Sequence, residues 1–277
     1  MRMKKITTVA LMAILAGMSS VPAAAQPGQN YRPKPGEKSL QAVFYYWQTN
    51  MGMLRGVAEI EAVRSLEHQA KGVIQVDGKP CTLSAYRVSI SYTEEGMRVQ
   101  YTCKLANGQE RKNIEVVSGR YAWDEDVMGA ELLPGVGKAT PKPALLNERL
   151  IRLWASPQGA PKAAKAGGAK TTVAWVGGKP VVTYPIPGVP GAIAKAALND
   201  LYLAEKIEVR QGGAVTTFTY SGYKDWNNPL NLIDALYAGT LVEARNGVIT
   251  RDLKTDVTET GNIYVTMPVP DSLKTRG

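Results

Sequence analysis

Histidine and cysteine are scarce in this sequence, which holds one histidine and two cysteines among 277 residues. One histidine cannot supply the cluster of histidines that holds the metal in a metallo-β-lactamase site. It also argues against a Ser-His-Asp triad, because no G-x-S-x-G motif carries a nucleophile. No Walker loop occurs either. We therefore expect no metal and no cofactor, and we expect His68, in the strand-like segment VRSLEHQAKG, to be a satisfied structural residue.

Long apolar runs are also lacking, and no segment approaches the roughly 20 consecutive apolar residues that a membrane helix needs. Residues 1–25, MRMKKITTVALMAILAGMSSVPAAA, instead combine basic residues, a short apolar run and small residues before Gln26. This pattern is typical of a secretory signal that is cleaved near Ala25. We therefore expect a periplasmic or secreted protein without an integral membrane segment.

The sequence carries a formal net charge of +9, but its basic residues are scattered and form no dense run. A basic surface suits anionic lipid or nucleic acid in principle. An exported chain rarely meets nucleic acid where it works. The distribution therefore favours a solvated surface and predicts no nucleic-acid partner.

Both cysteines lie in the segment PCTLSAYRVSISYTEEGMRVQYTC, which ends at Cys103. Their spacing fits neither a C-x-x-C redox motif nor paired zinc ligands. An oxidising compartment favours a disulfide between Cys81 and Cys103. Apolar residues alternate with polar ones on both sides of TEEG, which predicts a β-hairpin.

The hairpin register decides whether this disulfide is possible. If Tyr92 faces Met97, Cys103 lies opposite Tyr86 and Cys81 lies five residues further along. At about 3.3 Å per residue this gap is roughly 16 Å, whereas bridged Cα atoms lie within about 7 Å. The disulfide therefore predicts a bend or bulge between Cys81 and Tyr86, and a straight strand would mean two separate thiols.

The remaining sequence predicts an α+β protein that is mostly β. A flexible Pro/Gly-rich leader is expected at 26–36, then a helix in EKSLQAVFYYWQTNMGML and a second helix at 144–155. The small, cationic segment PQGAPKAAKAGGAK that follows reads as a surface loop or lid edge. A turn or short helix is expected at 230–236, and strands at 62–76, 84–92, 97–105, 113–123, 171–175, 179–185, 201–211, 214–223, 240–244, 248–255 and 262–267.

Several motifs together resemble known families. The phrase VVSGRYAWDED in mid-chain and the later LNDLYLAEKIEVRQGGAVTTFTYSGYKDW resemble the periplasmic lipoprotein carrier (LolA-like) family. The segments SGRYAWDED, LNERLIRLWASPQGAPKAA, YSGYKDW and YVTMPVPDSL are more closely similar to an uncharacterised exported domain. That domain often precedes a metallo-β-lactamase-fold hydrolase, and the hydrolase is absent from this sequence.

The resemblance implies a fold and a kind of ligand. The expected fold is a twisted antiparallel sheet that forms an incomplete (half) barrel, whose concave face is covered by two helices. For the carrier family it implies an apolar cavity that receives acyl chains. Residues 37–277 are expected to form a single LolA-like domain, with a C-terminal extension from about residue 226 that the carrier family lacks.

The apolar faces of the two expected helices are the candidate walls of this cavity, because methionine and aromatic side chains adapt to varied apolar ligands. The alternative is that these side chains simply fill the core. Two arginines flank the second apolar face and are candidates for a lipid headgroup or carboxylate, with solvent exposure as the alternative. The candidates are Leu40, Phe44, Trp47, Met51, Leu150, Leu153 and Trp154, with Arg149 and Arg152.

The sequence thus supports three hypotheses about function. The first is an exported protein that binds or carries a hydrophobic ligand (a lipid, an acylated protein or another amphiphile) without chemical turnover. The second is a structural or interaction module for a partner protein or hydrolase. The third is an enzyme that uses Asp124, Glu125 and Asp126, since paired carboxylates serve in glycoside hydrolysis or bind divalent metals. Acidic residues after a strand more commonly solvate a turn.

Overall fold

The computed structural model describes residues 31–55, 60–226, 235–261 and 265–274. The expected signal segment and residues 26–30 of the expected leader therefore lie outside the described residues, as does most of the turn or short helix expected at 230–236. No helix in the described part of the chain is long and apolar enough to cross a membrane.

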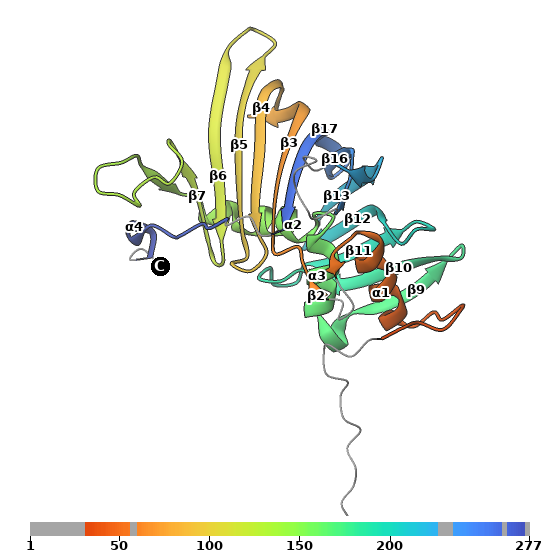
Figure 1. The fold of residues 1–277 in the computed structure, drawn as a ribbon. Coiled ribbons are helices and arrows are strands. Elements are labelled where there is room, and N and C mark those ends of the chain that lie inside the picture. The colour runs from red at the N-terminus through yellow and green to blue at the C-terminus, as the bar shows by residue number, and fades with distance from the viewer. Residues whose placement is uncertain (1–30, 56–59, 227–234, 262–264, 275–277) are drawn as a thin grey trace, which may run out of the picture.

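The main sheet has 13 strands, all of its pairs are antiparallel, and it is not closed into a barrel (Figure 1). Its order is β8-β7-β6-β5-β4-β3-β17-β16-β13-β12-β11-β10-β9. The strands are β3 (Ser65–Val76), β4 (Lys79–Ser91), β5 (Gly96–Leu105), β6 (Glu110–Ser118), β7 (Tyr121–Glu125), β8 (Ala139–Pro141), β9 (Thr172–Val176), β10 (Lys179–Pro185), β11 (Ile193–Leu198), β12 (Ala204–Gln211), β13 (Ala214–Ser221), β16 (Thr240–Arg245) and β17 (Val248–Gly261). The predicted fold class is confirmed.

The chain path explains why helices lie across one face of this sheet. From β3 at the centre the chain winds outward to the edge strand β8, and it later winds inward from the opposite edge, β9, to β17. The connection between the two edges carries α2 (Leu146–Trp154), after a 3₁₀ turn (Pro143–Leu145), and α3 (Gly159–Ala166), before a second 3₁₀ turn (Gly168–Lys170). The strands β16 and β17, from the segment expected to be an extension, lie in the middle of the sheet.

The first predicted helix is confirmed as α1 (Leu40–Asn50), which packs against α3. Ser39 caps it by accepting a hydrogen bond from the backbone N–H of Ala42. The helix ends at Asn50, whereas the sequence pattern predicted that it continues to Leu54. Small accessory elements complete the fold: β1 (Leu54–Arg55), β2 (Ile60–Glu61), β14 (Lys224–Asp225), β15 (Leu236–Tyr237) and α4 (Asp271–Lys274).

The prediction of a surface loop or lid edge at 157–170 is wrong, because its central part is the helix α3 and one side of that helix is buried. Ala160, Ala163 and Ala164 are fully buried, and Pro161 lies in the first turn, where no backbone N–H is needed. Small side chains let this helix approach its neighbours closely. The strands β8 and β11 were not predicted, and residues 265–267 are not in a strand, whereas 262–264 lie outside the described residues.

The disulfide between Cys81 and Cys103 is confirmed, with Cα atoms 5.5 Å apart. The predicted bulge is also present, since the β4–β5 register shifts between Leu83 and Ala85. The assumed register is wrong by two residues: Met97 pairs with Ile90, because the turn begins at Tyr92, one residue earlier than expected. With this register and the bulge, the two cysteines occupy diagonal positions on one face.

Candidate functional site

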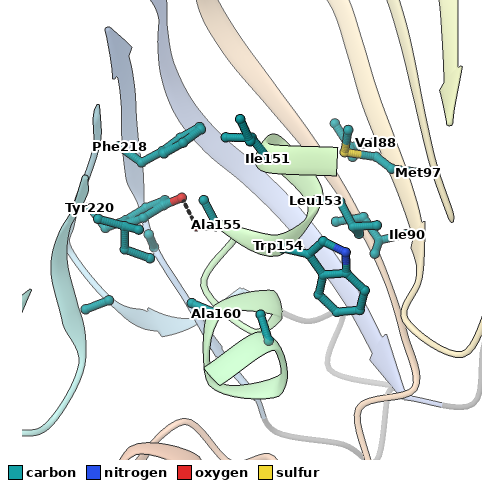
Figure 2. Packing of buried hydrophobic residues seen from close by; sticks show 14 of the residues in the cluster. Val88, Ile90, Met97, Ile151, Leu153, Trp154, Ala155, Ala160, Phe218 and Tyr220 are labelled. Carbon is teal, nitrogen blue, oxygen red and sulfur yellow. Dashed lines mark hydrogen bonds between the residues drawn. The ribbon is translucent and has the colours of Figure 1, made fainter. Parts of the chain in front are cut away.

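The concave face of the sheet carries an apolar surface, and α2 lies on it (Figure 2). Figure 2 shows side chains of α2 between two walls of the sheet. Val88, Ile90 and Met97 come from β4 and β5, and Phe218 and Tyr220 come from β13. The side chains of α2 and α3 that fill the space between them are Ile151, Leu153, Trp154, Ala155 at the end of α2, and Ala160.

A few hydrogen bonds hold the helical connection to the sheet. The hydroxyl of Tyr220 donates to the carbonyl oxygen of Ala155 over 2.6 Å (Figure 2). The hydroxyls of Tyr92 and Ser156 lie 3.1 Å apart. Gln158 Nε2 donates to the carbonyl oxygen of Leu236 over 2.8 Å. The covering helices and the chain that joins them thus make specific polar contacts, as well as apolar ones, with Tyr220, Tyr92 and Leu236.

A small cavity of about 30 Å³ remains between the sheet and α2. Its lining is largely aromatic and aliphatic, but it also includes His68, Arg152, Glu243 and Arg251. His68 Nδ1 and Arg251 Nε are buried without a hydrogen-bond partner. Burial lowers the pKa of His68 to about 4, so its ring is neutral at pH 7. His68 lies on a strand, as expected of a structural histidine. The expectation that its ring is fully hydrogen-bonded is wrong for Nδ1.

A network of buried arginine and glutamate side chains lies on the concave side, next to this cavity. Glu243 accepts from Arg152 Nε over 3.0 Å and from Arg251 Nη1 over 3.1 Å. Glu115 lies 3.6 Å from Arg152 and 3.5 Å from Arg251. Since β6 and β17 are separated in the sheet by β3, β4 and β5, this contact requires a strongly curved sheet.

The electrostatics of these groups follow from burial and close opposite charges. Burial alone would raise the pKa of Glu243, but the attraction of Arg152 and Arg251 outweighs it and lowers the pKa to about 2. Burial also opposes the charge of Arg152, yet its carboxylate neighbours raise its pKa above the ordinary value. All three groups are therefore ionised at pH 7.

The nine candidate cavity residues are distributed over two regions. Leu40 and Phe44 are half-buried on α1 and pack against the core, and Trp47 and Met51 are fully buried there. On α2, Leu150, Leu153 and Trp154 are buried in the core. Arg152 is the one candidate of the nine that lines the 30 Å³ cavity. Contact of these residues with a ligand stays a prediction.

Arg149 is turned inward instead of flanking α2 in solvent. Its Nη1 donates to the carbonyl oxygens of Val116, over 2.9 Å, and Trp123. Its Nη2 pairs with Asp124. This arginine therefore anchors the start of α2 to β6 and β7.

The acidic trio does not converge on one point. Asp124 pairs with Arg149 on α2, whereas Glu125 is buried with Arg98 and accepts from Trp123 Nε1. Asp126 accepts from backbone N–H groups of the loop that follows. Among the described residues, no group of three or more His, Cys, Asp or Glu residues is placed to hold a metal ion.

Sequence reasoning missed the residues of β13, β16 and β17 that complete the site. Glu243 and Arg251 occur in TLVEARNGVITRDL, where charged and apolar residues alternate. The alternation predicts strands, but it does not tell which face of each strand is buried. The inward position of these two charges depends on the pairing of β17 with β3. Arg251 lies opposite Ile74, 177 residues earlier in the sequence, and the local pattern does not predict that pairing.

No known family model matches the sequence, and no curated protein matches it at a significant level. Solved structures that resemble it include two that it covers almost completely. One is described as an outer membrane lipoprotein-sorting protein domain from Vibrio parahaemolyticus, with 11% identity and a TM-score of 0.43, over 84% of this chain and 97% of the other. The other is a LolA superfamily protein from Nitrosomonas europaea, with 12% identity and a TM-score of 0.42, over 85% and 97%.

Proposed function

We propose that this protein is an exported carrier that binds a hydrophobic or amphiphilic ligand between the concave sheet and its covering helices, without chemical turnover. The observation that supports it is the construction of the interior. Apolar and aromatic walls from both halves of the sheet face one space, and the connection between the two sheet edges, with α2 and α3, lies in it.

Binding requires displacement of these helices, since a cavity of about 30 Å³ holds little more than one or two water molecules. An acyl chain would take the place of Ile151, Leu153 and Trp154 against the sheet. Apolar burial of about 25 cal/mol per Å² stabilises both the state in which the helices cover the sheet and the state in which a ligand does. The ligand therefore replaces the apolar contacts of the helices with its own. The conformational change is therefore a competition between the covering helices and the ligand for the same surface.

The interior is apolar at one side and charged at the other. Val88, Ile90 and Phe218 offer an apolar wall, whereas Arg152 and Arg251 lie beside Glu243. A ligand with a polar group and an apolar chain fits this division, with its polar group toward Arg152. The lipid, acylated protein or other amphiphile expected from the sequence has this chemistry.

The experiment compares two tyrosines. Tyr220→Phe removes the hydrogen bond to Ala155 on the covering connection, whereas Tyr223→Phe removes a 2.9 Å bond to Ala204, away from α2 and α3. Losing one buried hydrogen bond costs about 1 kcal/mol, so Tyr220→Phe should speed uptake of a fluorescent fatty-acyl probe roughly fivefold. Tyr223→Phe should leave the uptake rate within about twofold of the wild type.

Native mass spectrometry of protein purified from the exported fraction supplies the second measurement. We expect a co-purifying amphiphile that organic extraction releases. Absence of bound lipid, together with no probe binding at micromolar concentration, would remove the carrier proposal. Equal uptake rates for Tyr220→Phe and Tyr223→Phe would show that ligand enters without moving the helices.

A further inference from the structure

The segment between β7 and β8 displays an unusual number of apolar side chains to solvent. Five of its residues are among the exposed large hydrophobic side chains of the described chain: Val127, Met128, Leu132, Leu133 and Val136. Met128 and Leu133 are 64% and 65% exposed. Figure 1 shows this segment, which we call the apolar loop (residues 126–138), projecting from the edge of the molecule beside α4.

The apolar loop is built so that its polar groups point back to its base. Its acidic residues are Asp126 and Glu131. The carboxylate of Asp126 accepts from the backbone N–H groups of Val127, over 2.8 Å, and Lys138, over 2.7 Å. The carboxylate of Glu131 accepts from the N–H of Ala139 and from the hydroxyl of Ser272 in α4. The outward surface of the loop is therefore left without an acidic group.

Several of its backbone groups are also paired within the loop. The N–H of Glu131 donates to the carbonyl of Val136 over 2.7 Å, and the N–H of Val136 donates to the carbonyl of Leu133 over 3.1 Å. Further turns join Ala130 to Val127 and Leu132 to Gly129. A loop that has already paired its backbone groups can leave water at a lower cost than an unpaired one.

The loop root is fixed to the convex side of the sheet. Ala130 is fully buried in a small core with Trp123, Met267 and Leu273, and the last of these belongs to α4. This core lies apart from the concave cavity. The loop is thus an ordered display of apolar side chains that the ligand-binding interior does not use.

Cationic side chains surround the foot of the loop. Lys112, Lys138 and Lys142 line an open hollow of about 880 Å³ there, with Lys71 and Arg87 further along. The acidic residues that line it are Asp124, Glu125, Asp126 and Asp256. Lys112 pairs with Glu110 over 3.1 Å at the surface. Lys142 lies 3.5 Å from Asp124, which pairs more closely with Arg149. Exposed ion pairs of this kind are weak, so the lysines can exchange these carboxylates for anionic headgroups.

From this arrangement we infer that the apolar loop docks the protein on an anionic phospholipid surface. The apolar tip enters the interface between headgroups and acyl chains, and the lysines at its foot pair with anionic headgroups. A protruding tip fits a bilayer interface, which needs no matching groove. The net charge favours the anionic surface, since it is +6 when the three basic residues of 1–25 are left out. This contact goes beyond the proposed carrier function, since it requires neither the cavity nor movement of α2.

Vesicle sedimentation tests this inference with the folded, exported chain. We expect binding to vesicles of phosphatidylethanolamine and phosphatidylglycerol, and weaker binding to phosphatidylcholine alone. Leu133→Asp and Met128→Asp should each lower the apparent affinity roughly tenfold, because each removes an inserted side chain and adds a repelled charge. The matched control is Val248→Asp, since Val248 is 64% exposed at the start of β17.

A fluorescence measurement reports insertion directly. Leu133→Trp should add an emission component that shifts to the blue with these vesicles, whereas Val248→Trp should show no such component. If the wild type fails to sediment with anionic vesicles, or if Leu133→Asp binds them as well as Val248→Asp does, the inference is overturned and the loop is left as a surface for a protein partner. Acyl-probe uptake by Leu133→Asp separates membrane docking from the carrier function. We expect this variant to lose vesicle binding and to take up the probe as the wild type does, because the loop does not line the cavity.

Discussion

Glu243 is the residue on which the charge arrangement of the interior depends. Its carboxylate lies between Arg152 and Arg251, and its side chain is 4% exposed. A buried ion pair is weak as a source of stability, because desolvation offsets much of the attraction. Removal of one partner is strongly destabilising, since it leaves the other charges buried and uncompensated.

We predict that Glu243→Gln lowers the free energy of unfolding by about 3–5 kcal/mol at neutral pH. The folded-state pKa of about 2 lies below the ordinary 4.5, so the ionised carboxylate stabilises the fold above pH 4.5. This contribution is lost as the pH falls from about 4.5 toward about 2. Urea unfolding of wild type and variant should therefore show a gap that narrows in that window.

The control for this measurement is Glu205→Gln. The Glu205 side chain is 51% exposed and lies 3.8 Å from Lys179. Its loss should change the free energy of unfolding by no more than about 0.5 kcal/mol. A gap between wild type and Glu243→Gln that stays constant down to about pH 3 would contradict the assigned ionisation of Glu243.

At the scale of elements, the β4–β5 hairpin depends on one extra residue. Without the register shift between Leu83 and Ala85, Cys81 and Cys103 would lie on opposite faces of the sheet. The bulge brings them to one face, where they are buried in the core.

We predict that replacing both cysteines by alanine lowers the free energy of unfolding by about 3 kcal/mol, because the disulfide closes a loop of sequence separation 22 in the unfolded chain. Urea unfolding with and without a reductant measures this effect. The reductant should lower the midpoint of the wild type and leave the double variant unchanged. An equal response of both proteins to the reductant would show that the bond is not what stabilises the hairpin.

The secondary structure that was predictable from the sequence had strong local patterns. The two amphipathic helices and the strands around the TEEG hairpin have clear periodicity, and the scarcity of cysteine made the disulfide and its bulge derivable. The helix α3 and the strand β11 were missed because both are rich in alanine. Ala194 and Ala196 are buried in β11, whereas Ala163 and Ala164 are buried in α3, so the neighbours and not the residue type decide the conformation.

The candidate site was less predictable than the fold. The residues of α2 could be assigned to the covered face from their spacing, but the opposite wall comes from β13, and the charges come from β16 and β17. No local pattern shows that a strand near the end of the chain pairs with β3 near its beginning. The inward turn of Arg149 and Arg152 follows from acceptors on those distant elements, which amphipathicity does not reveal.

At the scale of the whole molecule, one seam joins the two halves of the sheet. The strands β3 to β8 form one half, β9 to β13 with β16 and β17 form the other, and the pair β3–β17 connects them. Because β17 lies far from β3 in the sequence, this pairing closes a long loop and depends on the correct assembly of both halves. The interior that we propose as the ligand site has walls from each half, so the seam also fixes its width.

Gly72 allows the seam to be tested at a single position. It lies opposite Leu253 in β17 with φ +141°, and a Cβ atom there would lie 2.0 Å from the carbonyl oxygen of Asp252. We predict that Gly72→Ala lowers the free energy of unfolding by about 2–4 kcal/mol, the sum of backbone strain and overpacking. Gly78→Ala, at φ +71° with nothing within 4 Å, should cost about 1 kcal/mol.

Hydrogen exchange distinguishes an effect on the seam from an effect on one hairpin. In Gly72→Ala, amides of β4 on one side and of β16 on the other should lose protection by the same factor, because both halves depend on the same strand pair. In Gly78→Ala, which changes the turn between β3 and β4, any local loss should stay in that hairpin. Unequal losses across the seam in Gly72→Ala would mean that the halves unfold separately, and the shared interior would then have to be stabilised by the helices that cross it.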